Sequence, residues 1–117
     1  MSIDYTNSFA NMSIDSFTNV SIDTDIHVGK IVMGPFEKRD VATIIFAGNS
    51  FNLDWDLENN RSLLHHIDRY AFSFPAHMTI RQIIDWFFVD YTVDNNSNLD
   101  LLVSDAHSCV FKIKNKN

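Results

Sequence analysis

Residues 78–91, MTIRQIIDWFFVDY, carry the strongest periodic signal in this sequence. Apolar side chains recur there at i, i+3, i+4, i+7 and i+8, which is one face of an α-helix: Ile80, Ile83, Ile84, Phe87 and Phe88. Thr79 and Gln82 fit a capping box, in which each side chain bonds a backbone N–H that the first helical turn leaves unpaired. The pattern predicts a helix starting at Thr79, with an apolar stripe that another surface, most simply a sheet, has to cover.

The size and composition of the chain suit one folded domain. A chain of 117 residues can bury enough apolar surface to be stable without disulfides or metal. Hydrophobic residues make up 45% of it and ten residues are Phe, which excludes a disordered chain. We divide it into a polar N-terminal segment (1–18), a single globular domain (19–114) and a short tail (115–117).

Two stretches before the helix alternate as strands do. Residues 19–28 place apolar and polar side chains in turn, the strand can continue to Met33, and Gly34-Pro35 breaks it. Residues 41–47 are rich in β-branched side chains, and residues 51–57 alternate strictly after the turn-forming residues 48–50. Residues 41–47 and 51–57 therefore predict a β-hairpin.

The remaining elements complete a predicted α+β domain. Asn59 or Asn60 can cap a second helix over about residues 61–71, whose apolar stripe is Leu63, Leu64, Ile67 and Ala71. Residues 99–104 and 109–113 predict two last strands. The order β-β-β-α-α-β-β favours a mainly antiparallel sheet with two helices packed on one face.

Strict alternation in 51–57 also predicts an acidic face. If Phe51, Leu53, Trp55 and Leu57 face the core, the intervening side chains line the opposite face about 7 Å apart: Asn52, Asp54, Asp56 and Glu58. We expect these four residues to contact a partner. Trp86 lies off the main helical stripe, so it either widens the buried face or is exposed as a fifth partner-binding residue.

Residue types that could carry chemistry are scattered. His65, His66, His107 and Cys109 are potential metal ligands, but their spacing matches no standard zinc motif. The tightest acid and base grouping is Asp23, Asp25 and His27 on one predicted strand face, a pattern that an Asp-rich strand produces easily. The chain has three glycines and no Gly-rich phosphate loop. We predict no catalytic site, no metal and no cofactor.

The charge and hydropathy of the chain limit the kinds of partner that we expect it to bind. The net charge is −6, and residues 1–111 hold fifteen acidic but only six basic residues, because Lys112, Lys114 and Lys116 lie at the end. Such a surface repels phosphate backbones and suits a protein partner with a basic surface, so we expect no direct nucleic-acid binding. The sequence has no apolar run near 18 residues and no signal peptide, which predicts no membrane contact and a cytoplasmic location.

Three classes of function remain open. The first is a small acidic, non-catalytic binding protein that inhibits a nucleic-acid-handling partner, as immunity, antitoxin and anti-defence proteins do, its carboxylates acting as a nucleic-acid mimic. The second is a structural or accessory subunit with an apolar aromatic interface around Trp86. The third is an enzyme or small-ligand binder with a cavity that sequence cannot reveal. Strength of binding in 0.5 M salt separates the first class from the second.

Overall fold

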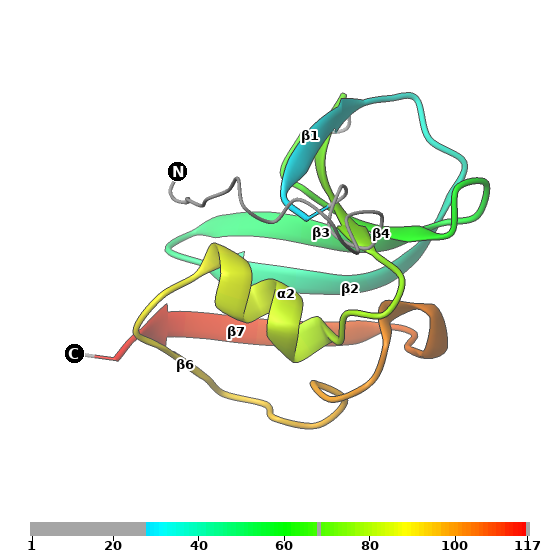
Figure 1. Ribbon diagram of the computed structural model, residues 1–117. Helices are drawn as coiled ribbons and strands as arrows, with labels where there is room; N and C mark the ends of the chain where they lie inside the picture. The colour runs from blue at the N-terminus through cyan, green and yellow to red at the C-terminus, as the bar shows by residue number, and fades with distance from the viewer. Residues whose placement is uncertain (1–27, 68, 117) are drawn as a thin grey trace, which may run out of the picture.

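One seven-stranded sheet carries the fold, with strand order β1-β5-β4-β3-β2-β7-β6 (Figure 1). The computed structural model describes residues 28–67 and 69–116. Its strands are β1 (Lys30–Met33), β2 (Lys38–Phe46), β3 (Asn49–Asp56), β4 (Arg61–His65), β5 (Tyr70–Pro75), β6 (Tyr91–Val93) and β7 (Cys109–Asn115). All neighbours run antiparallel except β2 and β7, which are parallel. The sheet is therefore mixed, which the β-β-β-α-α-β-β order did not predict.

The α+β class is confirmed, but the two-helix arrangement is wrong. The described residues hold one α-helix, α2 (Ile80–Phe87), and one 3₁₀ helix, η2 (Val103–Asp105). Residues 61–71, the second predicted helix, form β4, a turn and the start of β5. Leu63 and Leu64 are both fully buried, on opposite faces of β4. A strand covered on both faces has no alternation, so its apolar run can match a helical spacing.

The predicted hairpin is confirmed as β2 and β3. Phe46 pairs with Asn49, so the turn is Ala47-Gly48, slightly earlier than expected. Both turn residues have positive φ, 51° and 81°, as a two-residue type I′ turn requires. β2 also has an irregular register between Asp40 and Ala42, where Val41 is the extra residue. Such a bulge bends the strand and increases its twist.

Helix α2 begins as predicted. Thr79 is its N-cap, and both hydrogen bonds of the capping box with Gln82 are present. The next two backbone N–H groups, of Ile80 and Arg81, donate to the carbonyl oxygens of Leu101 and Leu99 at 3.0 and 2.8 Å. The segment 99–104, predicted as a strand, instead bonds the start of this helix and continues into η2. The helix ends at Phe87, earlier than the predicted Tyr91.

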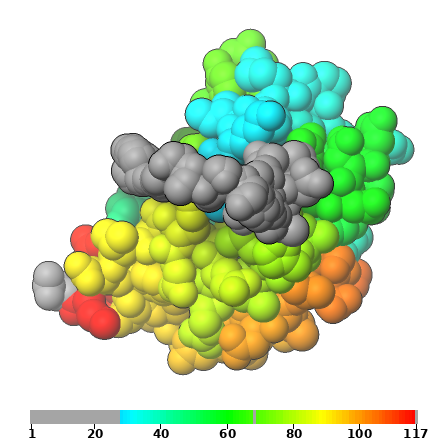
Figure 2. Space-filling model, in the orientation of Figure 1, coloured from blue at the N-terminus to red at the C-terminus, as the bar shows by residue number. Residues whose placement is uncertain are grey.

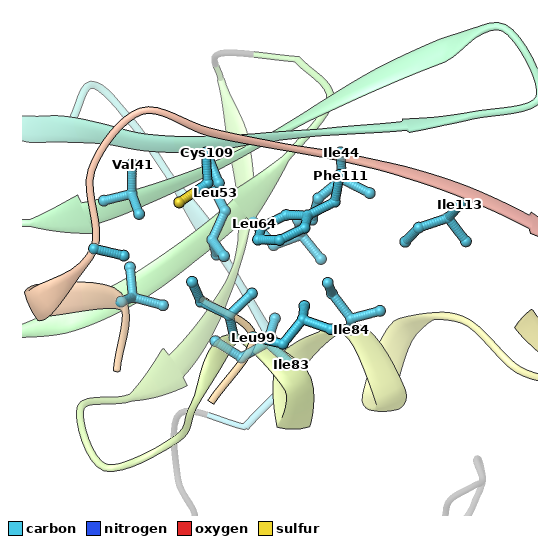
Figure 3. Packing of buried hydrophobic residues seen from close by; sticks show 14 of the residues in the cluster. Val41, Ile44, Leu53, Leu64, Ile83, Ile84, Leu99, Cys109, Phe111 and Ile113 are labelled. Carbon is cyan, nitrogen blue, oxygen red and sulfur yellow. The ribbon is translucent and has the colours of Figure 1, made fainter. Parts of the chain in front are cut away.

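The core lies between α2 and one face of the sheet. Figure 1 shows α2 in front of β2, β3 and β7, and Figure 3 shows Ile83 and Ile84 directed toward the sheet. The fully buried side chains that meet there come from the helix, five strands and the segment after β6: Ile80, Ile83, Ile84, Ile44, Leu53, Leu64, Phe74, Phe111, Leu99 and Val103. The predicted apolar stripe of α2 is thus the helix side of the core.

The opposite face of β3 and β4 is also buried. Asp54 and Leu63 oppose each other across these strands, and they are 1% and 0% exposed. β1 and β2 are joined by residues 34–37 alone, although β5, β4 and β3 separate them in the sheet. In Figure 1, β1 is turned strongly away from the direction of β2 and β3. The curl of the sheet at this end encloses a second, partly charged interior.

One further predicted strand is confirmed, and other predictions lie partly or wholly outside the described residues. The strand predicted over 109–113 is confirmed as β7. Of the strand predicted from residue 19 to Met33, the structure shows β1. The polar segment 1–18, the start of that strand and the grouping of Asp23, Asp25 and His27 lie outside the described residues.

Candidate functional site

The charged interior is built around Asp54. Its side chain and that of His65 are 1% and 0% exposed, and His65 Nε2 lies 2.5 Å from Asp54 Oδ2. Strand geometry explains the pairing, because Asp54 on β3 opposes Leu63, and His65 lies two residues further along the same face of β4. A buried carboxylate needs partners of this kind, since the loss of water around an unpaired charge is very unfavourable.

Lys38 brings a full positive charge to the same carboxylate. Its Nζ lies 3.4 Å from Asp54 Oδ2 and 3.7 Å from Asp40 Oδ1. Asp40 and Asp54 are directly opposed across β2 and β3, an arrangement in which two like charges destabilise the pairing. The lysine offsets that repulsion from within the protein. Asp54 is therefore a neutralised interior group, not a free surface charge.

Asp56 has a separate set of partners at the end of β3. Arg61 Nε donates to its Oδ2 at 2.8 Å, and the two side chains are 13% and 1% exposed. Asn59 and the backbone N–H groups that follow the strand supply the other bonds. This carboxylate therefore organises the turn from β3 to β4.

Asp56 should make the stability of the fold sensitive to acid. Burial raises the pKa of its carboxyl, but the hydrogen bonds from Arg61, Asn59 and the backbone outweigh burial and leave the pKa below its ordinary value of 3.8. Such a group stabilises the fold above its unfolded pKa, and the contribution disappears as the pH falls through the folded pKa. We expect the unfolding free energies of the wild type and Asp56→Asn to differ at neutral pH and converge below about pH 4 in urea titrations.

Asp100 provides the matched control. Arg81 Nε lies 2.8 Å from its carboxylate and lowers its pKa in the same direction, but the two side chains are 44% and 81% exposed. Solvent screens exposed pairs, so Asp100→Asn should change stability little at any pH. An Asp56→Asn variant that behaves like Asp100→Asn would contradict the structural role of Asp56.

A polar pocket opens beside Asp54. It has a volume of about 320 Å³, and its polar lining comes from β2, β3 and the start of β7: Asp40, Thr43, Asn52, Asp54, Ser108 and Cys109. The His65 side chain is fully buried, whereas Asp40, which lines the pocket, has an exposed side chain. The ion pair with Lys38 compensates the charge of Asp54 inside the protein.

The expected acidic face is only partly realised. Asn52, Asp54 and Asp56 do share one face of β3, but the two carboxylates are buried and paired with cations. The expectation that they are exposed is wrong, because the curl of the sheet covers them. Glu58 is exposed but lies beyond the end of the strand, in the turn. Contact of these four residues with a partner stays a prediction.

The sequence did not lead us to place three residues beside Asp54 and Asp56: Lys38, Arg61 and His65. A helix over 61–71 separates Arg61 and His65 from β3, whereas a β-hairpin with period two places both on the face of Asp54 and Asp56. The pairing Asp56–Arg61 across a four-residue turn is a signal that could have shown this.

The possible metal ligands do not come together. Within residues 28–67 and 69–116, no three His, Cys, Asp or Glu side chains gather closely enough to hold a metal ion. His66 packs against the ring of Phe51 with 5.2 Å between centroids, and His107 Nδ1 lies 2.8 Å from Arg39. Cys109 is buried, with its sulfur 3.5 Å from Asn98 Nδ2. Each of these groups has a local packing or hydrogen-bonding role.

An apolar surface lies at the β1 end of the sheet, where β1 meets the β4–β5 hairpin. Ile31, Met33, Ile67 and Tyr70 are 61%, 62%, 52% and 45% exposed. Ile31 opposes Phe72, and Met33 opposes Tyr70, so these side chains share one face of β1 and β5. We call Ile31, Met33, Ile67, Tyr70 and Phe72 the hairpin surface. It borders an apolar pocket of about 240 Å³, lined also by Leu64 and His66.

Trp86 borders the same surface. Its ring packs against those of Phe72 and Phe74, with 5.6 and 5.2 Å between centroids, while 43% of the residue stays exposed. It also lies over Gly29, where a Cβ would come within 2.1 Å of the indole ring. Trp86 thus both widens the buried face and reaches solvent. Its role in partner binding stays a prediction.

Among the described residues, no helix has the length and apolar content needed to cross a bilayer. Comparison with protein-family models, with curated proteins and with solved structures finds no match for this chain.

Proposed function

We propose that this chain is a binding protein that contacts a partner protein through the hairpin surface and the exposed edge of Trp86. The observation that supports it is the gathering of four large, roughly half-exposed apolar side chains, three of which line one apolar pocket. Exposed apolar residues that occur singly are ordinary, whereas a contiguous group around a pocket is typical of an interaction site. The pocket is small for a drug-sized ligand but suits one side chain of a partner.

The acidic inhibitor of a basic, nucleic-acid-handling protein is the second candidate. Its support is the net charge of −6 and the exposure of carboxylates such as Asp40, whose side chain is 92% exposed. Asp54 and Asp56 give it less support than expected, because both are buried and form ion pairs with Lys38 and Arg61. We rank it below the apolar interface for that reason.

The two candidates respond differently to salt and to substitution. A partner captured by the full-length chain from cells that express it would be purified, and its Kd measured in about 0.05 and 0.5 M NaCl. An apolar interface should hold its Kd within about threefold, and Ile67→Asp should weaken binding at least about tenfold by placing a charge in the contact. Ile67 is half-exposed, so this variant should keep the thermal midpoint of the wild type.

The control for charge is Glu37→Lys with Asp94→Lys. Both positions are exposed and form no ion pair with any described residue, so the variant changes the net charge and leaves the hairpin surface intact. We expect it to bind the partner as the wild type does. Binding that disappears in 0.5 M NaCl and in this variant, but survives Ile67→Asp, would support the acidic inhibitor instead.

A further inference from the structure

β1 lies at the edge of the sheet as far as the structure describes it, and the backbone groups that point away from β5 can be assigned residue by residue. In the described part of the chain it pairs with β5 alone. The backbone N–H of Gly34 donates to Arg69 O at 3.0 Å, in the register in which Met33 opposes Tyr70. Hydrogen-bonded and non-hydrogen-bonded pairs alternate along an antiparallel ladder. Lys30 and Val32 therefore bond β5, whereas Ile31 and Met33 direct their N–H and C=O groups to the free edge.

Between Lys30 and Met33 the described edge carries no proline and no bulge, although the strand is only four residues long and Pro35 follows it. Edge strands are commonly blocked by a proline, a bulge or inward-pointing charges. The outward-facing positions of β1 are instead Ile31 and Met33, whose side chains are also exposed. Figure 2 shows β1 and the connection after it, in cyan, at the upper rim of the molecule. An added strand at this edge would place every second side chain on the face of the hairpin surface, beside its pocket.

The strands at this end of the sheet differ in composition from the connections beside them, which contain Glu37 and Asp68. β1, β5 and β4 contain no Asp or Glu, although the chain carries fifteen acidic residues. Directly beyond the end of β1, Lys38 and Arg69 line a pocket of about 380 Å³ together with Gly34, Pro35 and Phe36. Lys38 already pairs with Asp54 and Asp40, so the exposed Arg69 is the cation of this pocket that can select a partner carrying a carboxylate as well as an apolar side chain.

We propose that the partner docks as an extended peptide segment that adds a strand to the free edge of β1. Its backbone bonds Ile31 and Met33, an apolar side chain enters the pocket of the hairpin surface, and an Asp or Glu side chain meets Arg69. In strand addition, main-chain bonds supply affinity and pockets for alternate side chains supply specificity. This inference rests on the proposed function and adds the conformation and charge of the partner segment.

The test uses a phage library of random linear 12-residue peptides, selected against the full-length protein. Enriched peptides should combine an apolar residue with Asp or Glu. Synthetic copies should bind Ile31→Pro about tenfold more weakly than Ile31→Ala in fluorescence anisotropy, because both variants lose the isoleucine side chain but only proline lacks the N–H. Proline is tolerated where an edge N–H faces away from the sheet, so the two variants should have similar thermal midpoints.

Amide hydrogen exchange of the wild type gives a second readout that needs no variant. The peptide should protect the amides of Ile31 and Met33. Three results would overturn the inference: equal affinity of Ile31→Pro and Ile31→Ala, absence of this protection, or a selection without enriched peptides. The proposed function is tested separately, by the binding of Ile67→Asp. Protection in the peptide-free monomer means that the chain's own residues occupy the edge, and protection that appears with dimerisation means that a second copy does. Either result also overturns the inference.

Discussion

Phe111→Ala should destabilise the protein by about 3–5 kcal/mol, enough to unfold many domains of this size. Phe111 is completely buried on β7, opposes Ile44 on β2, and belongs to the core between the sheet and helix α2. Removal of its ring loses the transfer free energy of the buried surface and leaves a cavity that neighbouring strands cannot close. Urea unfolding followed by tryptophan fluorescence measures the loss.

The adjacent residue gives a control on the same strand. Val110 faces away from the core and is 49% exposed, so Val110→Ala should change the unfolding free energy by less than about 1 kcal/mol. Similar losses for Phe111→Ala and Val110→Ala would mean that β7 is not inserted between β2 and β6 as described. That result would remove the parallel pairing that makes the sheet mixed.

Local signals predicted the parts of the fold that depend on local interactions. The capping box of Thr79 and Gln82 and the stripe that follows marked the start of α2 correctly, because both lie within one or two helical turns. The β2–β3 hairpin followed from alternation and a glycine-containing turn. These features depend on residues close together in the chain, which is why sequence patterns could show them.

The errors come from long-range pairing. Ser62, Leu63, Leu64 and His65 are all buried because β4 lies between β3 and β5 with both faces covered, so the segment shows no period of two. The parallel contact of β7 with β2 joins residues more than sixty positions apart, and no local pattern specifies it. The end of α2 was placed too late because Phe88 is a buried residue in an extended conformation, not a further helical one.

The same limit applies to the candidate site. Alternation correctly placed Asn52, Asp54 and Asp56 on one face of β3, but whether that face meets water depends on how the sheet curls. Exposed Ile31, Met33 and Tyr70 belong to two strands that meet only in the folded sheet. Trp86 was recognisable from its position on the helix, since that required only the period of α2.

The central claim is that Asp54 and Asp56 stabilise the protein as buried, ion-paired side chains, and that the hairpin surface binds the partner. The variant Asp54→Lys with Asp56→Lys tests it. Removal of one partner from a buried ion pair costs about 3–5 kcal/mol, and here two pairs break while two cations are added beside Lys38, Arg61 and His65. The expected loss, roughly 6–10 kcal/mol, is comparable with the whole stability of a small domain.

The decisive measurement is the thermal unfolding of this variant by circular dichroism, beside Glu37→Lys with Asp94→Lys as a control of equal charge change at exposed positions. We expect the variant at positions 54 and 56 to show no cooperative transition and the control to unfold within a few degrees of the wild type. A cooperative transition at the wild-type midpoint for Asp54→Lys with Asp56→Lys would contradict the claim, because it would show that these carboxylates face solvent and remain free to meet a basic partner.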